Sequence, residues 1–556
     1  MKNNQTNQKL LVEIKRLKKE LKKKKKYGLV WEDKSEDVVE MCKENLPVLK
    51  EVKSKEIITD KNKPVNLLIK GDNYHTLSIL NYTHAKKIDV IYIDPPYNTG
   101  AKNWKYNNNY VIKDDAFRHS KWLSMMEKRL YLAKNTLKED GCLICAIDEN
   151  EHANLVLLLE QVFPRYNIDS ITIVHNPRGI QGKNFSYNHE YAVFVYPNLK
   201  EKYISNAKRE STLVRNFRVD GSNSPRNTAK TCFYPFIIKE GKIIGVGEVA
   251  PKSFHPKKQT IEVKKGVFEV WPIDIKGIER KWSYSVNTVR EILDQLNTKK
   301  RSNRFEIYRS KDEAPYRTVW INSKYDANEY GSKLVNSITG VQFPFPKSLY
   351  TVKECLTAVA KNKKNATILD FFAGSGTTGQ AVLEMNIDDN GKRKFIICTN
   401  NEGNICTEVC YPRIKSVIKG YKKQSNGEKI KGLGGNLKYF KTDFVSYKEP
   451  TDRNKIRLTE EAIEMLCVKE GTFEEVKNRA GFKIFKNSEH YTGIIFDQLV
   501  IKRFKKEIKN IKGKFSVYIF SLGDDSFEDE FEDIKQKVKL SPIPDAILKV
   551  YRRIFK

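Results

Sequence analysis

The stretch Ile91–Gly100, IYIDPPYNTG, places four chemically distinctive residues in a row where an apolar segment ends. Asp94 is a hydrogen-bond acceptor, and Pro95 and Pro96 fix the backbone while removing two N–H donors, so that their carbonyls can face inward. Tyr97 adds a flat aromatic face. This combination predicts a pocket for a planar ring that carries an amine. The alternative is a capped turn with no catalytic role.

The exocyclic amine of an aromatic base is a poor nucleophile because its lone pair is delocalised into the ring. If the Asp94 carboxylate accepts one amine hydrogen and the Pro95 carbonyl accepts the other, the nitrogen becomes pyramidal and its lone pair is localised. Stacking of the base on Tyr97 adds about 1–3 kcal/mol. What remains is alignment of the amine with an activated methyl group, a proximity effect that needs no covalent enzyme intermediate.

A second motif, ILDFFAGSGTTGQAV, runs from a predicted strand through a glycine turn into a predicted helix. Gly374 and Gly376 let the backbone approach a ligand closely, and the N-terminus of the helix offers free N–H groups. The spacing differs from the dinucleotide fingerprint, and no lysine follows as in a P-loop. The next predicted strand ends at Glu402, which can accept hydrogen bonds from a ribose. Together these features predict an adenosine-containing cofactor; the alternative is a tight turn beside a surface glutamate.

Alternating strands and helices must position these residues. Strands are predicted at VNLLIKGDN, IDVIYID, GCLICAIDENE and HEYAVFVYP, with amphipathic helices at SKWLSMMEKRLYLAKNTL and ANLVLLLEQVF between them. The pattern stops at about residue 198 and resumes at Thr367. Strand–helix alternation predicts a doubly wound α/β sheet, and such sheets bind ligands at the carboxyl ends of their strands.

The motifs DPPY and FAGSGTT resemble the catalytic and cofactor motifs of the amino-methylating DNA methyltransferases that use S-adenosylmethionine. The catalytic motif comes first in this chain, which resembles the permuted β class. The segments YGLVWEDKSE, NLLIKGDNYHTLSIL, FRHSKWLSMMEKRLYLAK, FPFPKS and RKFIICTNNE resemble the modification (Mod) subunits of type III restriction–modification systems. The resemblance covers residues 27–445 and, more loosely, the tail. It implies a Rossmann-like methyltransferase sheet.

The resemblance implies a role for each matching residue. The catalytic residues are Asp94, Pro95, Pro96 and Tyr97. The residues that bind S-adenosylmethionine are Asp72, Asn73, Lys347, Asp370, Phe371, Phe372, Gly374, Ser375, Gly376, Thr377 and Glu402. Two of these have simple alternatives, because Asp72 can cap the helix that follows it and Lys347 can be a surface lysine. The residues expected to border the target base are Asn98, Thr99 and Gly100.

The resemblance also implies the substrate. The target base must leave the duplex to enter the pocket, so base flipping in double-stranded DNA is expected. An acid at the first position of the tetrad is typical of adenine-N6 enzymes, whereas serine is commoner among cytosine-N4 enzymes. Methylation at cytosine C5 needs a cysteine nucleophile, normally after proline, and the sequence contains no Pro-Cys pair. We therefore expect adenine-N6 methylation, with cytosine-N4 methylation as an alternative.

Five regions are expected along the chain. They are a basic helix and arm (1–64, with the helix over 10–26), the catalytic half of the methyltransferase domain (65–197), an inserted target-recognition domain (198–340), the cofactor-binding half (341–445) and an α+β C-terminal accessory domain (446–556). Arginines and aromatic residues of the insertion suit contacts to base edges and backbone. The candidate DNA contacts are Asn98, Arg178, Lys183, Arg215, Arg218, Arg226, Lys281 and Trp282. For the basic residues among them, an ordinary basic surface is the alternative.

The composition narrows the class of partner and the compartment. Among 556 residues, 101 Lys and Arg face 69 Asp and Glu, a formal charge of +32. This excess favours a polyanion, because neutralised phosphates release counterions. Scattered cysteines suit a reducing cytosol, and their spacing gives no expected metal site. The sequence has no apolar run of membrane-spanning length and no secretory signal, so we expect a bacterial cytoplasmic, nucleoid-associated protein that does not bind a membrane.

Several functional interpretations stay open. The first is a site-specific adenine-N6 DNA methyltransferase, either solitary and regulatory or the Mod subunit of a restriction system. An RNA adenine methyltransferase is disfavoured by the permuted order and the large insertion. The third is a DNA-recognition subunit that recruits a separate helicase–nuclease, because the chain has neither a helicase P-loop nor a nuclease motif. A homodimer is expected from the resemblance.

Overall fold

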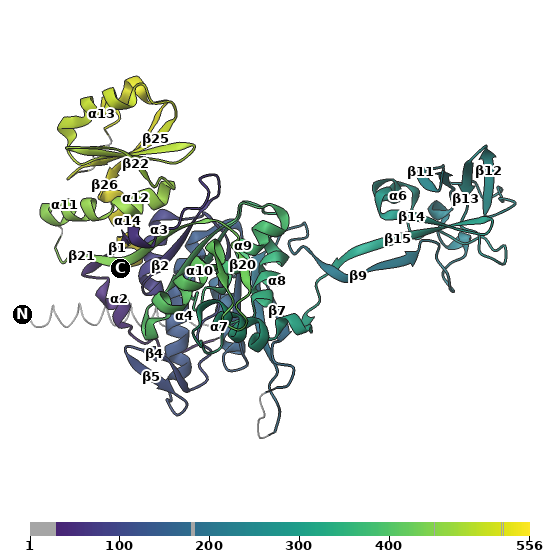
Figure 1. The fold of residues 1–556 in the computed structure, drawn as a ribbon, viewed down its shortest axis with the longest axis horizontal. Helices are drawn as coiled ribbons and strands as arrows, with labels where there is room; N and C mark the ends of the chain where they lie inside the picture. Colours follow the sequence, from purple (N-terminus) through teal and green to yellow (C-terminus); the bar gives the residue numbers. More distant parts are fainter. Residues whose placement is uncertain (1–28, 180–183, 450, 524, 526, 556) are drawn as a thin grey trace, which may run out of the picture. The chain divides into compact units, whose positions relative to one another are not determined.

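The computed structural model describes residues 29–179, 184–449, 451–523, 525 and 527–555 (Figure 1). The helix predicted over residues 10–26 and the candidate DNA contact Lys183 lie outside these residues. The described chain forms two compact units. The first unit comprises the residues up to Ile204 and from Arg317 onwards, and the second unit comprises Ser205–Tyr316.

The first unit is built on a ten-stranded sheet. In spatial order its strands are β1 (Asn45–Glu51), β21 (Asn436–Ser446), β2 (Val65–Lys70), β18 (Lys394–Thr399), β17 (Thr367–Asp370), β3 (Ile88–Ile93), β6 (Leu137–Ile147), β8 (His189–Pro197), β7 (Tyr166–Val174) and β16 (Val319–Trp320). From β21 to β6 each strand is parallel to its neighbour, whereas β1 and β8 are antiparallel to the strands beside them. The predicted α/β sheet is confirmed, with mixed strand directions at both edges.

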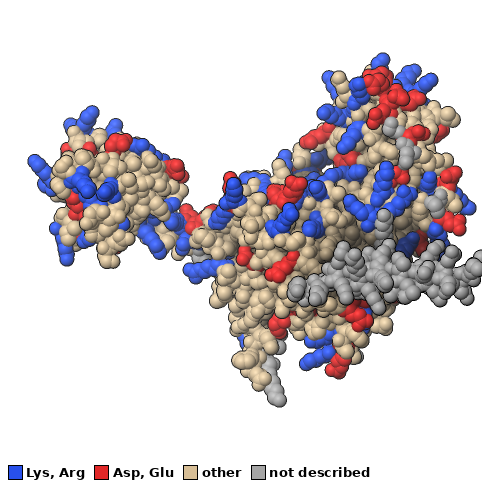
Figure 2. All heavy atoms as spheres, turned by 180° about the vertical axis from the view of Figure 1, so that it is seen from behind, with Lys and Arg blue, Asp and Glu red and all other residues tan. Residues whose placement is uncertain are grey.

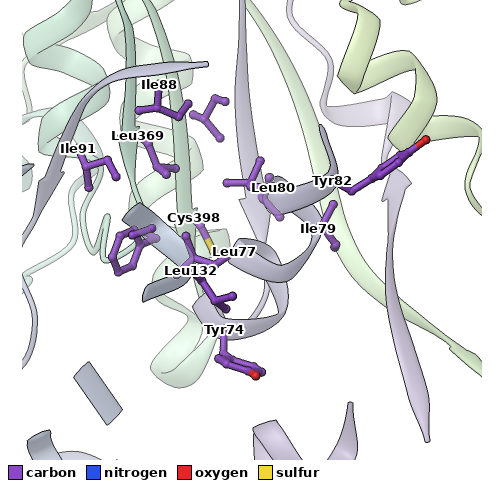
Figure 3. Close-up of a cluster of buried hydrophobic side chains, with 14 of the residues drawn as sticks. Tyr74, Leu77, Ile79, Leu80, Tyr82, Ile88, Ile91, Leu132, Leu369 and Cys398 are labelled. Atoms are coloured by element: carbon purple, nitrogen blue, oxygen red, sulfur yellow. The ribbon is translucent and has the colours of Figure 1, made fainter. Parts of the chain in front are cut away.

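Helices cover both faces of this sheet. They are α3 (Asn73–Thr83), α4 (Arg118–Thr136) and α5 (His152–Val162) on one side, and α7 (Lys333–Thr339), α8 (Leu349–Ala360), α9 (Thr377–Asp389) and α10 (Tyr411–Lys419) on the other. Figure 3 shows Leu77 of α3 close to Cys398 within the buried cluster that also contains Ile91 and Leu369. All six residues of β3 are buried, as expected for a central strand covered on both faces.

Shorter elements complete the first unit around the sheet. They are α2 (Asp37–Met41), the hairpin β4 (Ala101–Tyr106) and β5 (Asn109–Ile112), the pair β19 (Gly420–Lys422) and β20 (Lys429–Lys431), the 3-10 turns η1 (Lys53–Lys55), η5 (Ser323–Tyr325) and η7 (Glu402–Asn404), and the π-helical turns η6 (Asn328–Ser332) and η8 (Ile405–Cys410). No helix in the described part of the chain is long and apolar enough to cross a membrane.

The residues after β21 form a smaller α+β region with a five-stranded sheet. Its elements are α11 (Asp452–Glu461), α12 (Ile463–Glu470), β22 (Glu474–Arg479), β23 (Phe482–Lys486), β24 (His490–Ile495), η9 (Gln498–Val500), α13 (Ile501–Ile508), β25 (Lys514–Phe520), η10 (Asp529–Ile534), β26 (Val538–Ile543) and α14 (Asp545–Ile554). This region is joined to the large sheet by a common core, because Leu466 of α12 and Tyr551 of α14 are buried in the same cluster as α3. The Tyr551 hydroxyl donates to the Pro47 carbonyl at 2.5 Å.

The second unit consists of two small antiparallel sheets. They are β14 (Leu296–Arg301), β15 (Arg304–Pro315) and β9 (Asn206–Asn216) in one, and β11 (Lys242–Val246), β10 (Phe236–Lys239), β13 (Val267–Val270) and β12 (Thr260–Lys264) in the other. The remaining elements are α6 (Val286–Glu291), η2 (Arg226–Thr228), η3 (Lys230–Cys232) and η4 (Leu293–Gln295). An aromatic core that includes Phe217, Tyr234, Phe236 and Trp282 stabilises the unit.

The observed units differ from the expected regions at two places. The second unit is shorter than the insertion expected over residues 198–340, since β16 pairs with β7 in the large sheet and α7 also belongs to the first unit. The arm expected over residues 1–64 contributes β1, which pairs with β21 over seven residues. Short apolar segments such as VW at 319–320 carry too little pattern to reveal that they complete a distant sheet.

Three candidate DNA contacts of the second unit serve its fold. Trp282 is 2% exposed, its ring lies 5.0 Å from that of Phe236, and its indole N–H donates to the Tyr234 carbonyl at 2.7 Å. The Arg226 guanidinium binds the Phe254, Ala250 and Pro251 carbonyls and Glu279. Arg218 binds Asp220 and the Ile273 carbonyl. The expected DNA contact is therefore wrong for the buried Trp282, and the two arginines have structural partners.

We expect Trp282→Ala to lower the free energy of unfolding of the second unit by about 3–5 kcal/mol, because the substitution leaves a large cavity in its aromatic core. Chemical denaturation followed by tryptophan fluorescence and circular dichroism measures this change. Arg215→Ala, at an exposed position of β9, is the control and leaves the free energy of unfolding unchanged. Equal stability of the two variants would contradict the core assignment of Trp282.

Candidate active site

The two chemistry-bearing motifs meet where central parallel strands of the large sheet have their carboxyl ends. Strand β3 ends at Ile93 and continues directly into Asp94–Tyr97, while the adjacent strand β17 ends at Asp370 and continues into the glycine turn. The strands are parallel, with Val90 beside Ile368 and Ile91 beside Leu369. Their carboxyl ends therefore lie side by side, although the motifs are far apart in the sequence.

A cavity of about 150 Å³ opens where these strands end. The predicted site residues that line it are Asp94, Lys347, Asp370, Phe372, Gly374, Ser375 and Thr377. Phe343–Lys347, the segment that leads into α8, also lines the cavity. The structure thus brings together the acid of the first motif, the glycine turn and Lys347.

Lys347 is the centre of an ion-pair network in this cavity. Its ammonium nitrogen lies 3.4 Å from Asp94 Oδ1 and 2.5 Å from Glu190 Oε2. It also donates to the Tyr97 hydroxyl and lies 4.4 Å from the centroid of the Tyr97 ring. The Tyr97 hydroxyl donates to Glu190 Oε2 at 3.2 Å. Lys347 is buried, so its alternative as a surface lysine is wrong.

Burial and the neighbouring charges set the protonation states of this network. Burial raises the pKa of Asp94 to about 6, and Lys347 opposes this rise whereas Glu190 adds to it. For Glu190, burial favours a higher pKa, but Lys347, His175 and Tyr97 together outweigh it and hold the pKa below its usual value. For Lys347, the two carboxylates outweigh burial and raise the pKa. Near neutral pH the site therefore holds two carboxylates and one ammonium group.

The glycine turn is held in a conformation that leaves space beside its backbone. Gly374 has φ +50° and Gly376 has φ +82°, both in the left-handed region that favours glycine. A Cβ atom at Gly374 would meet only the Phe372 carbonyl oxygen, at 3.9 Å. Asp370 accepts hydrogen bonds from the Phe372 amide at 2.9 Å and from the Thr378 hydroxyl at 2.5 Å, and burial raises its pKa to about 7.

Hydrogen bonds to buried side chains fix the proline turn and the loop after Tyr97. The Trp122 indole donates to the Pro96 carbonyl at 2.6 Å, so the expectation that both proline carbonyls face inward unopposed is wrong for Pro96. Asn98 is fully buried with φ +58°, and its amide donates to Glu151 at 2.5 Å. Its side-chain oxygen accepts from the Trp104 indole at 3.1 Å. The predicted contact of Asn98 with DNA is therefore wrong; the residue shapes the loop instead.

Three predicted cofactor residues lie at neighbouring strand ends but do not line the cavity. Asp72 follows β2 and caps α3, since its carboxylate accepts from the Tyr74 amide at 2.7 Å. The Asn73 side-chain oxygen accepts from Arg129 Nε at 2.5 Å. Glu402 follows β18, and its carboxylate lies 2.7 Å from the ammonium of Lys105. The strands β2, β18, β17 and β3 are neighbours in this order. The residues at their carboxyl ends therefore form a row in the same order: Asp72, Glu402, Asp370 and Asp94.

The other candidate DNA contacts are at the surface. Arg178 of the first unit and Arg215 of the second are exposed, and Lys281 of the second unit is partly exposed, with its ammonium 3.4 Å from Asn223 Oδ1. Figure 2 shows Lys and Arg side chains over the visible face of each unit. Such surfaces suit a polyanion.

Two pairs of cysteines that lie close together in the sequence are part of the packing. Cys142 and Cys145 are buried in β6, and Cys406 and Cys410 are buried in η8. Among the residues that the structure describes, no group of three or more His, Cys, Asp or Glu side chains is arranged to hold a metal ion.

Comparisons with known proteins identify the family. The sequence matches the DNA methylase family N6_N4_Mtase over residues 88–409, which spans both motifs and the cavity. The chain belongs to this family. The predicted S-adenosylmethionine-dependent DNA methyltransferase is thereby confirmed at the level of the family, which includes both N6 and N4 methylases.

Named relatives agree with this assignment. The chain is 32% identical over 373 residues to the type II methyltransferase M.KpnI of Klebsiella pneumoniae, covering 61% of this chain and 82% of that protein. It is 28% identical over 451 residues to the Mod subunit of the type III restriction–modification enzyme EcoPI of Escherichia phage P1, covering 71% and 67%. Among solved structures, the M1.HpyAVI–SAM complex matches at 13% identity and a TM-score of 0.29, covering 63% of this chain and 98% of that one.

Two side chains of this DNA methylase were missed by sequence reasoning. Glu190 lies near the start of β8, which is antiparallel and therefore begins at the edge where β3 and β6 end. The sequence feature that could have revealed Glu190 is an acid within the apolar strand HEYAVFVYP. Arg413 of α10 is fully buried behind the glycine turn and donates to Ser375 Oγ at 3.0 Å and Thr377 Oγ1 at 2.8 Å. Its signal was its place on the apolar stripe of α10, beside Ile414.

We expect the acid limb of the pH–rate profile to move in opposite directions in Lys347→Met and Glu190→Gln. Asp94 is a much stronger acceptor for an amine hydrogen as a carboxylate than as a neutral acid, so activity falls as the pH falls through its pKa of about 6. Removing the ammonium raises that pKa and moves the limb to higher pH. Removing the Glu190 charge lowers it and moves the limb to lower pH. The measurement is kcat/KM for DNA methylation between about pH 5 and 8.

Lys353→Met is the matched control for these variants. Lys353 lies in α8 and pairs with Glu384 and Asp388, outside the residues that line the cavity. The acid limb of the pH–rate profile of Lys353→Met is expected to coincide with that of the wild type. A common direction of shift in the Lys347 and Glu190 variants would contradict the electrostatic coupling of both groups to Asp94.

Proposed function

We propose that the protein is a site-specific adenine-N6 DNA methyltransferase that acts on an adenine flipped out of double-stranded DNA. The observation that carries this proposal is the cavity shared by Asp94 of the DPPY motif and the glycine turn of Phe372–Thr377. One motif supplies acceptors for an aromatic amine, and the other offers an open backbone beside a helix N-terminus. Membership of the DNA methylase family supports the same chemistry.

The chain's own groups prepare the amine for attack. The Asp94 carboxylate accepts one amine hydrogen and the Pro95 carbonyl accepts the other, which localises the nitrogen lone pair. The hydrogen bond from the Trp122 indole to the Pro96 carbonyl fixes the proline turn, and therefore fixes the direction of the Pro95 carbonyl. Tyr97 stacks on the base. With a pKa of about 6, the Asp94 carboxylate can also accept the proton that the nitrogen loses after methylation.

The residues around the glycine turn fit S-adenosylmethionine. Gly374 has open space where a side chain would stand, α9 begins at Thr377, and Asp370 carries a buried carboxyl group beside the turn. We assign the methionine end of the cofactor to Asp370, Phe372, Gly374, Ser375 and Thr377, supported by the neighbouring Phe371 and Gly376. When bound, S-adenosylmethionine supplies an electrophilic methyl group on a positively charged sulfur. The carboxylates of this edge complement that charge.

Further along the same edge, we assign the ribose to Glu402 and the adenine to the region of Asp72 and Asn73. These residues follow β18 and β2, the next two strands from the glycine turn. Glu402 pairs with Lys105 of the β4–β5 hairpin. Binding of the ribose therefore requires exchange of this ion pair for hydrogen bonds to the hydroxyl groups.

Adenine is favoured over cytosine by the first residue of the tetrad. Asp94 is an acid, which is typical of the adenine-N6 enzymes that the sequence resembles, whereas cytosine-N4 enzymes more often have serine there. The relatives named as type III Mod subunits support the same choice. A cytosine-N4 methyltransferase remains the second candidate because the family includes N4 methylases.

The relatives named as type III Mod subunits also support a proposal for the partners. We propose that the chain is a Mod-like subunit that recognises DNA, acts as a homodimer and associates with a separate helicase–nuclease subunit; a solitary regulatory enzyme is the alternative. The second unit is the proposed target-recognition domain, with exposed Arg215 and Lys281 as its remaining candidate contacts. Arg178 of the first unit is the remaining candidate near the catalytic strands.

We expect DNA from cells that express the wild type to carry N6-methyladenine at one defined sequence motif, and DNA from cells that express Asp94→Asn to carry none. The substitution removes the charge that accepts the amine hydrogen while keeping the shape of the side chain. Modification-sensitive sequencing measures both genomes, and Lys353→Met is the matched control that should methylate as the wild type does. Methylated cytosine at N4 in place of adenine would support the second candidate. Methylation by Asp94→Asn equal to that of the wild type would contradict the mechanism.

A further inference from the structure

Phe345 has a side chain whose placement the fold does not explain. It lies in the segment Phe343–Lys347, which lines the catalytic cavity. Its side chain is nevertheless 87% exposed, among the largest exposures of any large apolar residue in the described chain. Burial of an aromatic ring is favourable. An exposed ring at the wall of a functional cavity therefore indicates a surface that binds a ligand.

The backbone of Phe345 is also strained. Its φ of +56° lies in the left-handed region, which is unfavourable for a bulky residue. In addition, Phe345 precedes Pro346, and a residue before proline favours an extended conformation. Strain of this kind persists only where the surroundings impose it, and it concentrates at functional sites.

The surroundings of Phe345 do impose this conformation. Pro346 is buried, and its carbonyl oxygen lies so close to Gly331 of η6 that a Cβ atom there would stand 2.4 Å from it. Lys347 is held by Asp94 and Glu190, and the buried Ser348 donates to the Lys324 carbonyl at 2.7 Å. The residues that follow Phe345 are therefore fixed, and its ring is projected from a rigid support.

We propose that Phe345 stacks on the flipped target base and thereby supplies a second aromatic contact beside that of Tyr97. The inference rests on the proposed function. The base amine must reach Asp94, and Lys347 joins Asp94 and Tyr97 to the segment that carries Phe345. Phe345 and Asp94 line the same cavity, and stacking requires only that the base have a flat face. Phe345 therefore holds the base in the pocket without reading its identity.

The adenine ring of the cofactor is a second purine that offers a flat face for stacking on Phe345. The two purines differ in what they predict for binding. A contact to the flipped base affects the affinity for DNA and the environment of the target base, whereas a contact to the cofactor affects the affinity for S-adenosylmethionine. We commit to the flipped base because Lys347, which follows Phe345 closely in the chain, contacts both residues assigned to that base.

The experiment uses the full chain and two duplexes that contain the target motif. One has adenine at the target position and is used to measure methylation. The other has 2-aminopurine there and is used only for binding and fluorescence, because 2-aminopurine has no amine at C6. The variants are Phe345→Leu, which keeps an apolar side chain but removes the aromatic face, and Phe345→Trp, which keeps that face. Leu499→Ala, at a position 90% exposed in the C-terminal region, is the control for loss of an exposed apolar side chain. Thermal unfolding confirms that each variant folds.

We expect Phe345→Leu to lower kcat/KM for DNA by about 5- to 150-fold, the range given by loss of one base–aromatic stack. The 2-aminopurine fluorescence of its complex should be brighter than that of the wild type, because a stacked ring quenches the probe. Phe345→Trp and Leu499→Ala should behave as the wild type does. The dissociation constant for S-adenosylmethionine should be the same in all four proteins.

Two results would overturn the inference while leaving the proposed function intact. One is a Phe345→Leu variant that methylates and quenches as the wild type does. The other is weaker binding of S-adenosylmethionine by Phe345→Leu with unchanged 2-aminopurine fluorescence, which would assign the ring to the cofactor. By contrast, a wild-type protein that produces no methylated motif would end the proposed function and this inference together.

Discussion

The parallel pairing of β3 with β17 is the constraint on which the site depends. Each strand alone delivers one motif, and in the proposed reaction neither motif acts without the other, because an amine prepared by Asp94 needs a methyl donor held at the glycine turn. Parallel neighbours end at the same edge of a sheet, so the pairing of Ile91 with Leu369 places the two motifs side by side. Catalysis then follows from proximity and needs no covalent step. The order of the motifs along the chain is free to vary, since only the spatial order of the strands determines this contact.

The network around Lys347 adds an electrostatic constraint to this geometry. Two neighbouring buried carboxylates raise each other's pKa. A protonated Asp94 would be a weaker acceptor for the hydrogen bonds from the Lys347 ammonium and from the amine of the base. The Lys347 ammonium lies between Asp94 and Glu190 and keeps both ionised near neutral pH. Glu190 in turn fixes Lys347 and accepts from Tyr97, so one residue aligns both the charge and the ring. The segment before α8 thereby becomes a rigid wall of the cavity.

The sequence predicts the parts of this site that local patterns encode. Both motifs follow apolar strands, and the glycine turn begins a helix, so the positions of Asp94, Asp370 and Gly374 could be inferred from strand ends alone. Glu190 could not, because its approach to Lys347 depends on β8 being antiparallel and on the strand order β3, β6, β8. Surface and core are also hard to separate among basic and aromatic residues. Trp282 and Arg226 stand in a sequence typical of DNA contacts, yet long-range packing with Phe236 and Glu279 uses them for the fold.

Several buried ionisable groups at the carboxyl ends of the strands reduce the stability of the fold. Burial shifts Asp94, Asp370 and Arg413 towards their neutral forms, with pKa values of about 6, 7 and 10. Arg413 Nη2 is buried without a hydrogen-bond partner, although the same guanidinium holds the glycine turn through Ser375 and Thr377. Buried charges whose partners compensate burial only in part destabilise a fold, and they persist where surrounding packing offsets them. The continuous core from the large sheet through α3 to α12 and α14 provides that packing. The C-terminal helices therefore contribute to the active site indirectly, because they stabilise the sheet whose edge carries it.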